Sequence, residues 1–293
     1  MSIYAGVDVG AVGVKAALLV PRDRAEGILA GNGTRPALRR LDVPGASRAQ
    51  AGDEGGTCVL VANYRRTRGQ PLETTRAMLA ELLACVGPDG IAGITLTGSG
   101  STLVAAALGV SRCNEFQALA RAIDLLYPHV RTVFELGGET SKYLRLEPDL
   151  GSGTLSILDY STNGDCAAGT GAFLDQQAGR LKYAVEDIGR IVDTAERAAQ
   201  IAGRCSVFAK SDMIHAQQKG FTPAEVLRGL CNAVARNYKS AVVKGRTPVP
   251  PIALVGGVSA NTAVVRGLRE VFELDNGALF VPEAAESMAA VGA

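Results

Sequence analysis

The sequence predicts a two-lobed α/β protein that is built on a duplicated hairpin unit. Apolar runs at residues 3–9 and 14–20 are separated by a turn that is too short for a crossover, so they should pair as an antiparallel hairpin. The same succession of apolar strand, acidic residue, glycine turn and apolar strand returns at residues 132–146. Apolar residues at helical spacing follow each hairpin. We therefore expect two mixed sheets covered by helices, in lobes that pack closely around a cleft.

Composition indicates a globular, cytoplasmic protein. The chain has 293 residues, of which 47% are hydrophobic, and this is enough for one large or two medium domains with buried cores. A net charge of +1 and the absence of Trp disfavour a nucleic-acid partner. We expect no membrane segment, because no apolar run approaches the roughly 20 residues that span a bilayer, and no signal peptide. Six cysteines in such a compartment favour metal or catalytic use of one or two over disulfides.

The first lobe is expected to span residues 1–114. After the hairpin, residues 21–56 show no firm period, and the next segments alternate between strand-like and helix-like patterns. We predict strands at 57–62 and 91–96, a helix at 72–86, and a small-residue turn at 97–100 that opens a helix ending near residue 108.

The second lobe is expected to span residues 115–282, and a helix at 114–126 leads into it. Thr222 as N-cap and Pro223 at the first helical position mark the start of a helix that should run to about residue 243. We predict the other strands at 132–136, 143–146, 154–158, 252–255 and 279–281, and the other helical stretches at 168–180, on to 192, 196–200, 207–217 and 259–272. Residues 283–293 could return to the first lobe as a helix.

Each hairpin has the features of a phosphate-binding turn. Asp8 and Glu135 end the first strand of their hairpins, and the glycines that follow let backbone amides approach a ligand closely. A strand followed by two glycines and a helix near residue 256 is a third turn of this kind. The alternatives are ordinary hairpins in which the acids cap the turn, while Lys15 and Lys142 are solvated residues at the strand ends.

Two cysteines stand at expected helix N-termini. Cys166 lies in a glycine-rich stretch between a strand and a helix, and Cys205 precedes another helix. Such a terminus presents unpaired N–H groups and the positive end of the helix dipole, which attract a phosphate or a metal-bound thiolate. The alternative for both is buried packing. The other cysteines lie in apolar runs and are expected to be core residues: Cys58, Cys85, Cys113 and Cys231. His129 and His215 lack metal-ligand spacing, which argues against zinc.

Together these motifs resemble a known group of ATPases. Residues 4–15, 135–138 and 254–261 resemble the phosphate-1, phosphate-2 and adenosine motifs of the actin, Hsp70 and sugar-kinase ATPase fold. Within that fold, residues 166–174 and 203–212 are similar to the iron–sulfur activators (component A) of 2-hydroxyacyl-CoA dehydratases and the ATPase subunits of benzoyl-CoA reductases, the BadF/BadG/BcrA/BcrD type. The resemblance covers nearly the whole chain. It implies two ribonuclease H-like lobes with a nucleotide cleft between them.

The resemblance also implies an activity, cofactors and partners. A homodimer would hold one [4Fe-4S] cluster on Cys166 and Cys205 of both chains. Asp8 and Glu135 would organise Mg²⁺ and the attacking water, and ATP hydrolysis to ADP would drive an electron from ferredoxin or flavodoxin to a partner dehydratase or reductase. The remaining residues predicted to bind nucleotide are Gly10, Ala11, Val12, Gly13, Lys15, Gly137, Gly138, Glu139, Lys142, Gly169, Thr170, Gly171, Gly256, Gly257 and Asn261.

The chain departs from the family pattern at both phosphate turns. Residues 11–13 are Ala-Val-Gly where the family has Ser and Thr, so hydroxyl contacts to phosphate are lost while backbone N–H groups remain. Glu135 replaces Asp, and Glu139 and Thr140 replace Gln and Asp. Two other functions therefore stay open: a small-molecule kinase of the same fold, of the amino-sugar type, and a nucleotide-sensing module that does not hydrolyse ATP. The cysteine motifs argue against the kinase.

Overall fold

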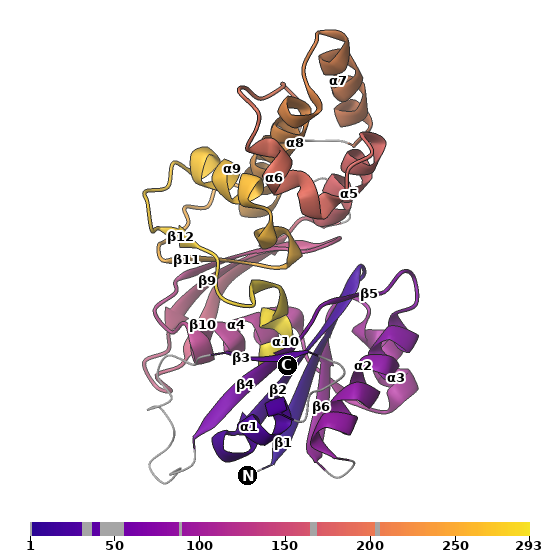
Figure 1. Cartoon of the computed structure of the whole chain (residues 1–293). Coiled ribbons are helices and arrows are strands. Elements are labelled where there is room, and N and C mark those ends of the chain that lie inside the picture. Colours follow the sequence, from indigo (N-terminus) through magenta and orange to yellow (C-terminus); the bar gives the residue numbers. More distant parts are fainter. Residues whose placement is uncertain (1, 31–36, 42–55, 88–89, 165–168, 203–205) are drawn as a thin grey trace. The chain divides into compact units, whose positions relative to one another are not determined.

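A computed structural model describes residues 2–30, 37–41, 56–87, 90–164, 169–202 and 206–293, and for residues 206 and 207 the backbone alone (Figure 1). The chain divides into two compact units. The first comprises Met1–His129, Glu147–Ile157 and Glu286–Ala293, and the second Val130–Leu146 and Leu158–Ala285. The lobe boundaries expected from the sequence stay predictions. Within the described ranges, every helix is too short or too polar to cross a membrane.

The first unit is organised around the predicted hairpin. Strands β1 and β2 pair antiparallel with Asp8 opposite Lys15, and β6 runs parallel to β1 on its other side. The strand order is β3-β4-β2-β1-β6-β7, with β5 also paired to β2. The bounds are Ile3–Val9 (β1), Gly13–Pro21 (β2), Leu38–Leu41 (β3), Thr57–Ala62 (β4), Arg65–Arg66 (β5), Ile91–Thr97 (β6) and Ser111–Arg112 (β7).

Successive residues of β1 face different helices. Ile3, Ala5, Val7 and Val9 are buried in one core with residues of α1, α2 and α3. Gly6 points the other way, and a Cβ placed on it would lie 2.1 Å from the carbonyl oxygen of Ala290 in α10. Helix α10 also packs against α4. The bounds are Arg22–Ala30 (α1), Pro71–Val86 (α2), Ser101–Leu108 (α3), Glu115–Leu126 (α4) and Met288–Gly292 (α10).

The sheet of the second unit repeats that of the first. Its order is β10-β9-β8-β11-β12, in which β8 and β9 form an antiparallel hairpin with Glu135 opposite Lys142, and β11 runs parallel to β8. The first unit contains the same succession as β4-β2-β1-β6-β7, which confirms the predicted duplication and fold class. The bounds are Thr132–Leu136 (β8), Ser141–Pro148 (β9), Leu155–Thr162 (β10), Ile252–Val255 (β11) and Leu279–Phe280 (β12).

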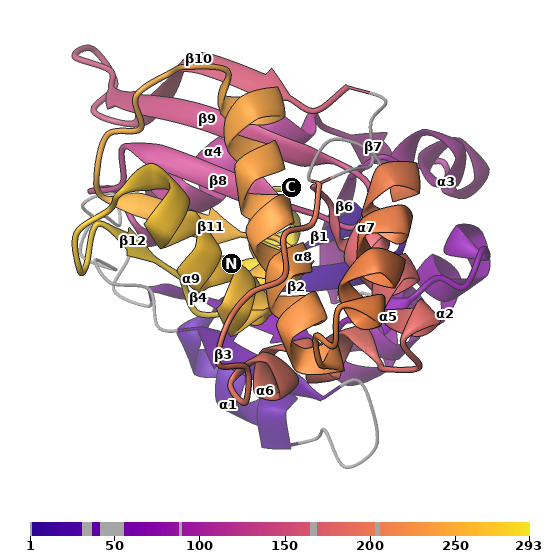
Figure 2. The same ribbon diagram turned by 90° about the horizontal axis from the view of Figure 1, so that it is seen from above.

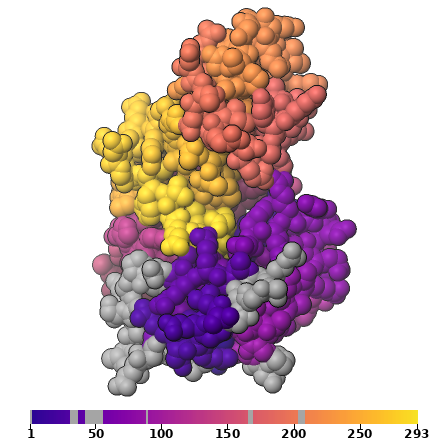
Figure 3. Space-filling view, viewed as in Figure 1, coloured from indigo at the N-terminus to yellow at the C-terminus, as the bar shows by residue number. Residues whose placement is uncertain are grey.

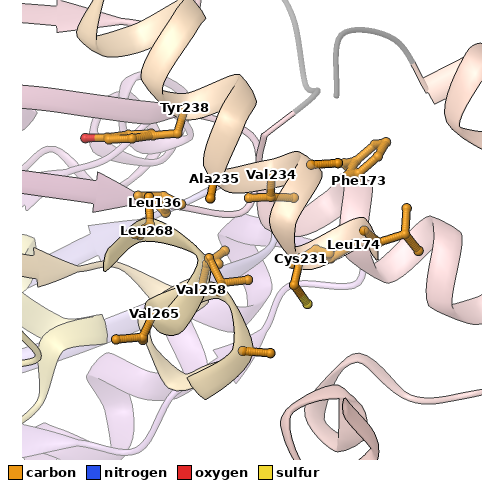
Figure 4. Packing of buried hydrophobic residues seen from close by; sticks show 14 of the residues in the cluster. Leu136, Phe173, Leu174, Cys231, Val234, Ala235, Tyr238, Val258, Val265 and Leu268 are labelled. Carbon is orange, nitrogen blue, oxygen red and sulfur yellow. The ribbon is translucent and has the colours of Figure 1, made fainter. Parts of the chain in front are cut away.

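Helices α8 and α9 cover one face of this second sheet (Figures 1 and 2). The core beneath them joins Leu136 of β8 to Phe173 of α5 and to Cys231 of α8 (Figure 4). The helices α5, α6 and α7, coloured salmon to orange, gather at one end of the unit (Figure 3). The bounds are Gly171–Arg180 (α5), Ile188–Val192 (α6), Ser206–Gln218 (α7), Pro223–Asn237 (α8) and Thr262–Phe272 (α9).

Several segments differ from the sequence-based expectation. Residues 196–200 are not helical, because their backbone groups bond to α8: Ala199 N–H donates to the carbonyl of Glu225. The helix predicted to reach residue 243 changes at Tyr238 into a π-helical segment, Tyr238–Val243. Helix α1 lies in the stretch without a period, and it buries only two of its side chains, so it leaves a weak sequence pattern.

We predict that Gly6→Ala destabilises the protein, because the new methyl group would have to displace α10. Overpacking of this kind costs about 1–3 kcal/mol, which should lower the unfolding midpoint in urea. Gly27→Ala is the control: a Cβ there meets nothing within 4 Å, and alanine favours the interior of α1 by up to about 1 kcal/mol. Equal midpoints for Gly6→Ala and the unchanged protein would contradict the close approach of α10.

Candidate functional site

Each hairpin carries a largely buried acid–lysine pair across its two strands. Lys15 Nζ lies 3.0 Å from Asp8 Oδ2, and Lys142 Nζ lies 3.1 Å from Glu135 Oε2. The four side chains are at most 14% exposed, so water screens these attractions weakly. Lys142 Nζ also donates to Thr140 Oγ1 over 2.9 Å. Neither lysine is the solvated strand-end residue of the alternative interpretation, and both are held beside the turn of their hairpin.

The turn between β8 and β9 has all four of its carbonyl oxygens occupied. The N–H of Gly137 closes the turn on the carbonyl of Thr140 over 2.9 Å. The amide Nδ2 of Asn163 donates to the carbonyl of Glu139 over 3.4 Å. The carbonyls of Gly137 and Gly138 accept from the first two residues of α5. Because a peptide unit is planar and trans, the N–H groups of Gly138 and Glu139 point away from α5.

Helix α5 begins directly on this turn. The N–H groups of Gly171 and Ala172 donate to the carbonyls of Gly137 and Gly138 over 2.9 and 2.7 Å. Ser141 Oγ donates to the carbonyl of Gly169 over 3.2 Å, so the predicted residues 169–171 lie against the β8–β9 turn. The first amides of α5 therefore bind protein carbonyls. Ala172 and Asn163 were not predicted as site residues: Ala172 carries no chemical signal in the sequence, whereas Asn163 stands at the start of the glycine-rich stretch.

The strand–Gly–Gly–helix turn after β11 approaches the end of β8. Gly256 has φ of +89°, and a Cβ placed on it would lie 2.5 Å from the carbonyl oxygen of Leu136 and 3.0 Å from Glu135 Oε1. Only glycine fits this approach without a shift of the chain. Asn261 Oδ1 caps α9 by accepting from two helical N–H groups over 3.0 and 3.2 Å. The second unit thus gathers Glu135, Gly137 and Gly256 at one point, while a Cβ added to Gly257 would meet nothing within 4 Å.

The two predicted cluster ligands, Cys166 and Cys205, lie outside the described residues. Of the cysteines that the structure describes, Cys58 and Cys231 are buried as expected, whereas Cys85 and Cys113 are only half-buried. Burial raises the pKa of the Cys231 thiol to about 12, which suits a packing residue and not a thiolate ligand. Across the described part of the chain, no three His, Cys, Asp or Glu side chains come close enough together to hold a metal ion.

The chain matches the family model described as the BadF/BadG/BcrA/BcrD ATPase family over residues 5–293. It is 31% identical over 181 residues to the 2-hydroxyisocaproyl-CoA dehydratase activator of Clostridioides difficile. The matched segment covers 61% of this chain and 64% of the relative. It is 30% identical over 162 residues to the activator of lactoyl-CoA dehydratase of Anaerotignum propionicum, which covers 55% and 60%. In both cases the matched segment is less than two thirds of the relative's length.

A solved structure shares the fold over the whole chain. It is the activator of the 2-hydroxyisocaproyl-CoA dehydratase from Clostridium difficile with bound ADPNP. The TM-score is 0.73 at 22% identity, and the match covers 100% of this chain and 92% of the other.

We predict that Cys231 resists iodoacetamide in the native protein at pH 8. The thiolate is the reactive form, and a pKa of about 12 leaves only about 10⁻⁴ of the thiol ionised at that pH. Peptide mass spectrometry would measure the labelling of Cys231 and of the half-buried Cys113 in the native protein. The same measurement in urea is the control, because both cysteines should react there. Native labelling of Cys231 as fast as that of Cys113 would contradict the core assignment.

Proposed function

The chain belongs to the BadF/BadG/BcrA/BcrD ATPase family, and we propose that it is a reductive activator that couples ATP hydrolysis to low-potential one-electron transfer. The acceptor would be a partner enzyme of the 2-hydroxyacyl-CoA dehydratase or benzoyl-CoA reductase type, since relatives are named as dehydratase activators. The observation that carries the proposal is the direct hydrogen-bonded link between the β8–β9 turn and α5, the helix that follows Cys166. It joins the candidate phosphate-binding turn to the helix that begins five residues after Cys166 in the chain.

ATP is the ligand that we assign to the glycine turns. In the second unit, the carbonyls of the turn are occupied by protein donors. The N–H groups of Gly138, Glu139 and Thr140 lie on the opposite sides of three of these peptide units, whereas that of Ser141, on the fourth, donates to Asn163 Oδ1 over 3.0 Å. Such a row of amides suits a phosphate. Lys142 adds a positive charge beside the turn, as Lys15 does in the first unit. The residues present therefore fit phosphate recognition although the hydroxyls of the family pattern are missing.

Asp8 and Glu135 are the groups that we assign to Mg²⁺ and to the attacking water. Carboxylate oxygens are hard donors of the type that Mg²⁺ prefers, and Mg²⁺ in nucleotide sites keeps several of its waters. In each pair the lysine bonds one carboxylate oxygen and thereby fixes the orientation of the acid. A carboxylate held in this way can accept a proton from a water placed next to the terminal phosphate.

The donor set also fits a [4Fe-4S] cluster shared by two chains. Such a cluster binds four thiolates and supplies a one-electron carrier of low potential. Burial raises the pKa of the Cys231 thiol, which makes it unsuited to ligation. Cys166 and Cys205 stand in the two motifs that resemble the family's cluster-binding motifs, so each chain would give two ligands to a homodimer. The electron donor would be a ferredoxin or flavodoxin.

We propose that the coupling between the nucleotide and the cluster passes through α5. A change of phosphate at the β8–β9 turn moves peptide units whose carbonyls are the acceptors for the first two amides of α5. Phe173 and Leu174 bind the same helix firmly to the core, beside Val234 of α8 (Figure 4). A shift of the turn would therefore be transmitted to the helix as a whole, and along the chain towards Cys166, which precedes Gly171 by five residues.

The proposed cluster is tested by measuring the iron content and the solution mass of protein that has been purified without oxygen. We expect four iron atoms per dimer in the unchanged protein, and none in Cys166→Ala or Cys205→Ala. Cys85→Ala is the matched control and should keep its iron, since Cys85 lies in α2 of the first unit. An iron-free monomer that still binds ATP would favour the kinase or the sensor, and the two cysteines would then be packing residues.

We further predict that Asp8→Asn lowers the rate of ATP hydrolysis on the order of 100-fold, because the carboxylate is lost while the shape of the side chain is kept. Asp159→Asn is the control: it removes a carboxylate that is paired with Arg246 and that is not assigned to the nucleotide site, and it should leave the rate unchanged. The measurement is phosphate release with the partner enzyme present, on variants whose thermal unfolding is normal. Undiminished hydrolysis by Asp8→Asn would remove Asp8 from the catalytic group.

A further inference from the structure

The turn between β1 and β2 is held from one side by a short segment, residues 63–67, which we call the strap. Its strand β5 pairs antiparallel with the start of β2, where Arg66 lies opposite Gly13. Arg65 forms a two-pronged ion pair with Glu81 of α2, and one of its hydrogen bonds, Nη1 to Oε1, is 2.9 Å long. The strap is therefore anchored to a helix on one side and to the hairpin on the other.

The strap occupies the carbonyl groups of the turn. Thr67 N–H donates to the carbonyl of Val12 over 2.9 Å, and Thr67 Oγ1 donates to the carbonyl of Ala11 over 3.0 Å. The carbonyl of Gly13 accepts from the N–H of Gly10 over 3.0 Å. Thr67 is only 3% exposed, so these bonds compete little with water. Three consecutive carbonyls are thus fixed before any ligand arrives.

Because the carbonyl groups of the β1–β2 turn are fixed, its N–H groups are fixed as well. Since each peptide unit is planar and trans, the N–H groups of Val12 and Gly13 must point away from Thr67. The turn contains no hydroxyl side chain, so backbone N–H groups are the donors that residues 11–13 can offer to a phosphate. Donors that are oriented in advance need no ordering when the ligand binds, and this strengthens binding.

Tyr64 completes the strap. Its ring lies directly on Gly13, where an added Cβ would come within 2.1 Å of Tyr64 Cε2. Its hydroxyl donates to the carbonyl of Val12 over 3.4 Å, and Lys15 Nζ lies 5.8 Å from the ring centroid. An ammonium at this distance from an aromatic ring is attracted to it. Tyr64 therefore accounts for glycine at position 13 and helps to hold Lys15 beside Asp8.

We infer that Thr67 and Tyr64 are positioning residues for the phosphate groups of the nucleotide. They hold the turn from behind, where the family pattern uses Ser and Thr within the turn itself. The second unit reaches the same result with different groups, since its turn carbonyls are held by α5 and Asn163. The inference rests on the proposed function, because it requires that the first turn binds phosphate.

The test is calorimetric binding of MgATP, MgADP and adenosine to Thr67→Val. Valine keeps the shape and the backbone N–H but removes the hydroxyl bond to Ala11. We expect the Kd for MgATP and MgADP to rise roughly three- to tenfold, as for the loss of one hydrogen bond, while adenosine binds as before. Thr67→Ser should restore the affinity. Thr75→Val is the matched control: its buried hydroxyl also donates to a backbone carbonyl, that of Pro71, but within α2.

The outcomes separate the inference from the proposed function. Unchanged Kd values in Thr67→Val, or an equal loss for ATP and adenosine, would overturn the inference and leave the activator intact. Failure of the unchanged protein to bind ATP would overturn both. If Thr67→Val does not fold, Tyr64→Leu supplies the same comparison, because it removes the ring from Gly13 and Lys15 and should again weaken ATP but not adenosine.

Discussion

The candidate phosphate site of the second unit depends on two hydrogen bonds, from the N–H groups of Gly171 and Ala172 to the carbonyls of Gly137 and Gly138. A peptide unit has a donor and an acceptor on opposite sides, so a turn that gives its carbonyls to a helix must present its amides elsewhere. The β8–β9 turn is therefore at once the cap of α5 and the candidate phosphate site. Any ligand that moves the turn acts on the same bonds that position the helix.

The two units share this principle but fix their turns with different groups. Both have an antiparallel hairpin, a parallel third strand and a largely buried acid–lysine pair at matching places. In the second unit the turn is tied to α5, which follows a predicted cluster ligand. In the first it is tied to the strap, and through Arg65 to α2. One copy of the duplicated unit is thus connected to the helix that follows the predicted ligand Cys166 in the chain, while the other is anchored to α2.

The sequence was sufficient to predict the features that depend on short-range pattern. The hairpins, their glycine turns and the places of Asp8 and Glu135 follow from apolar alternation and from turns too short for a crossover. A two-residue strand such as β5 has no period, and Thr67 resembles any loop threonine until the fold places it against Ala11. Residues 196–200 have a composition typical of a helix, but they are not helical, and the N–H of Ala199 bonds to the carbonyl of Glu225 in α8. What escaped prediction was long-range hydrogen bonding by residues without a chemical signature.

The most direct test of the account is the reduction potential of the cluster with ADP and with a non-hydrolysable ATP analogue, in Gly171→Pro and Gly171→Ala. Proline suits the first helical position, and the preceding Thr170 is extended as proline requires, but the N–H donor to Gly137 is lost. Alanine adds a Cβ and keeps that donor. We expect the potential to depend on the nucleotide in Gly171→Ala and in the unchanged protein, and much less in Gly171→Pro. The same nucleotide dependence in all three, or none in the unchanged protein, would contradict coupling through α5.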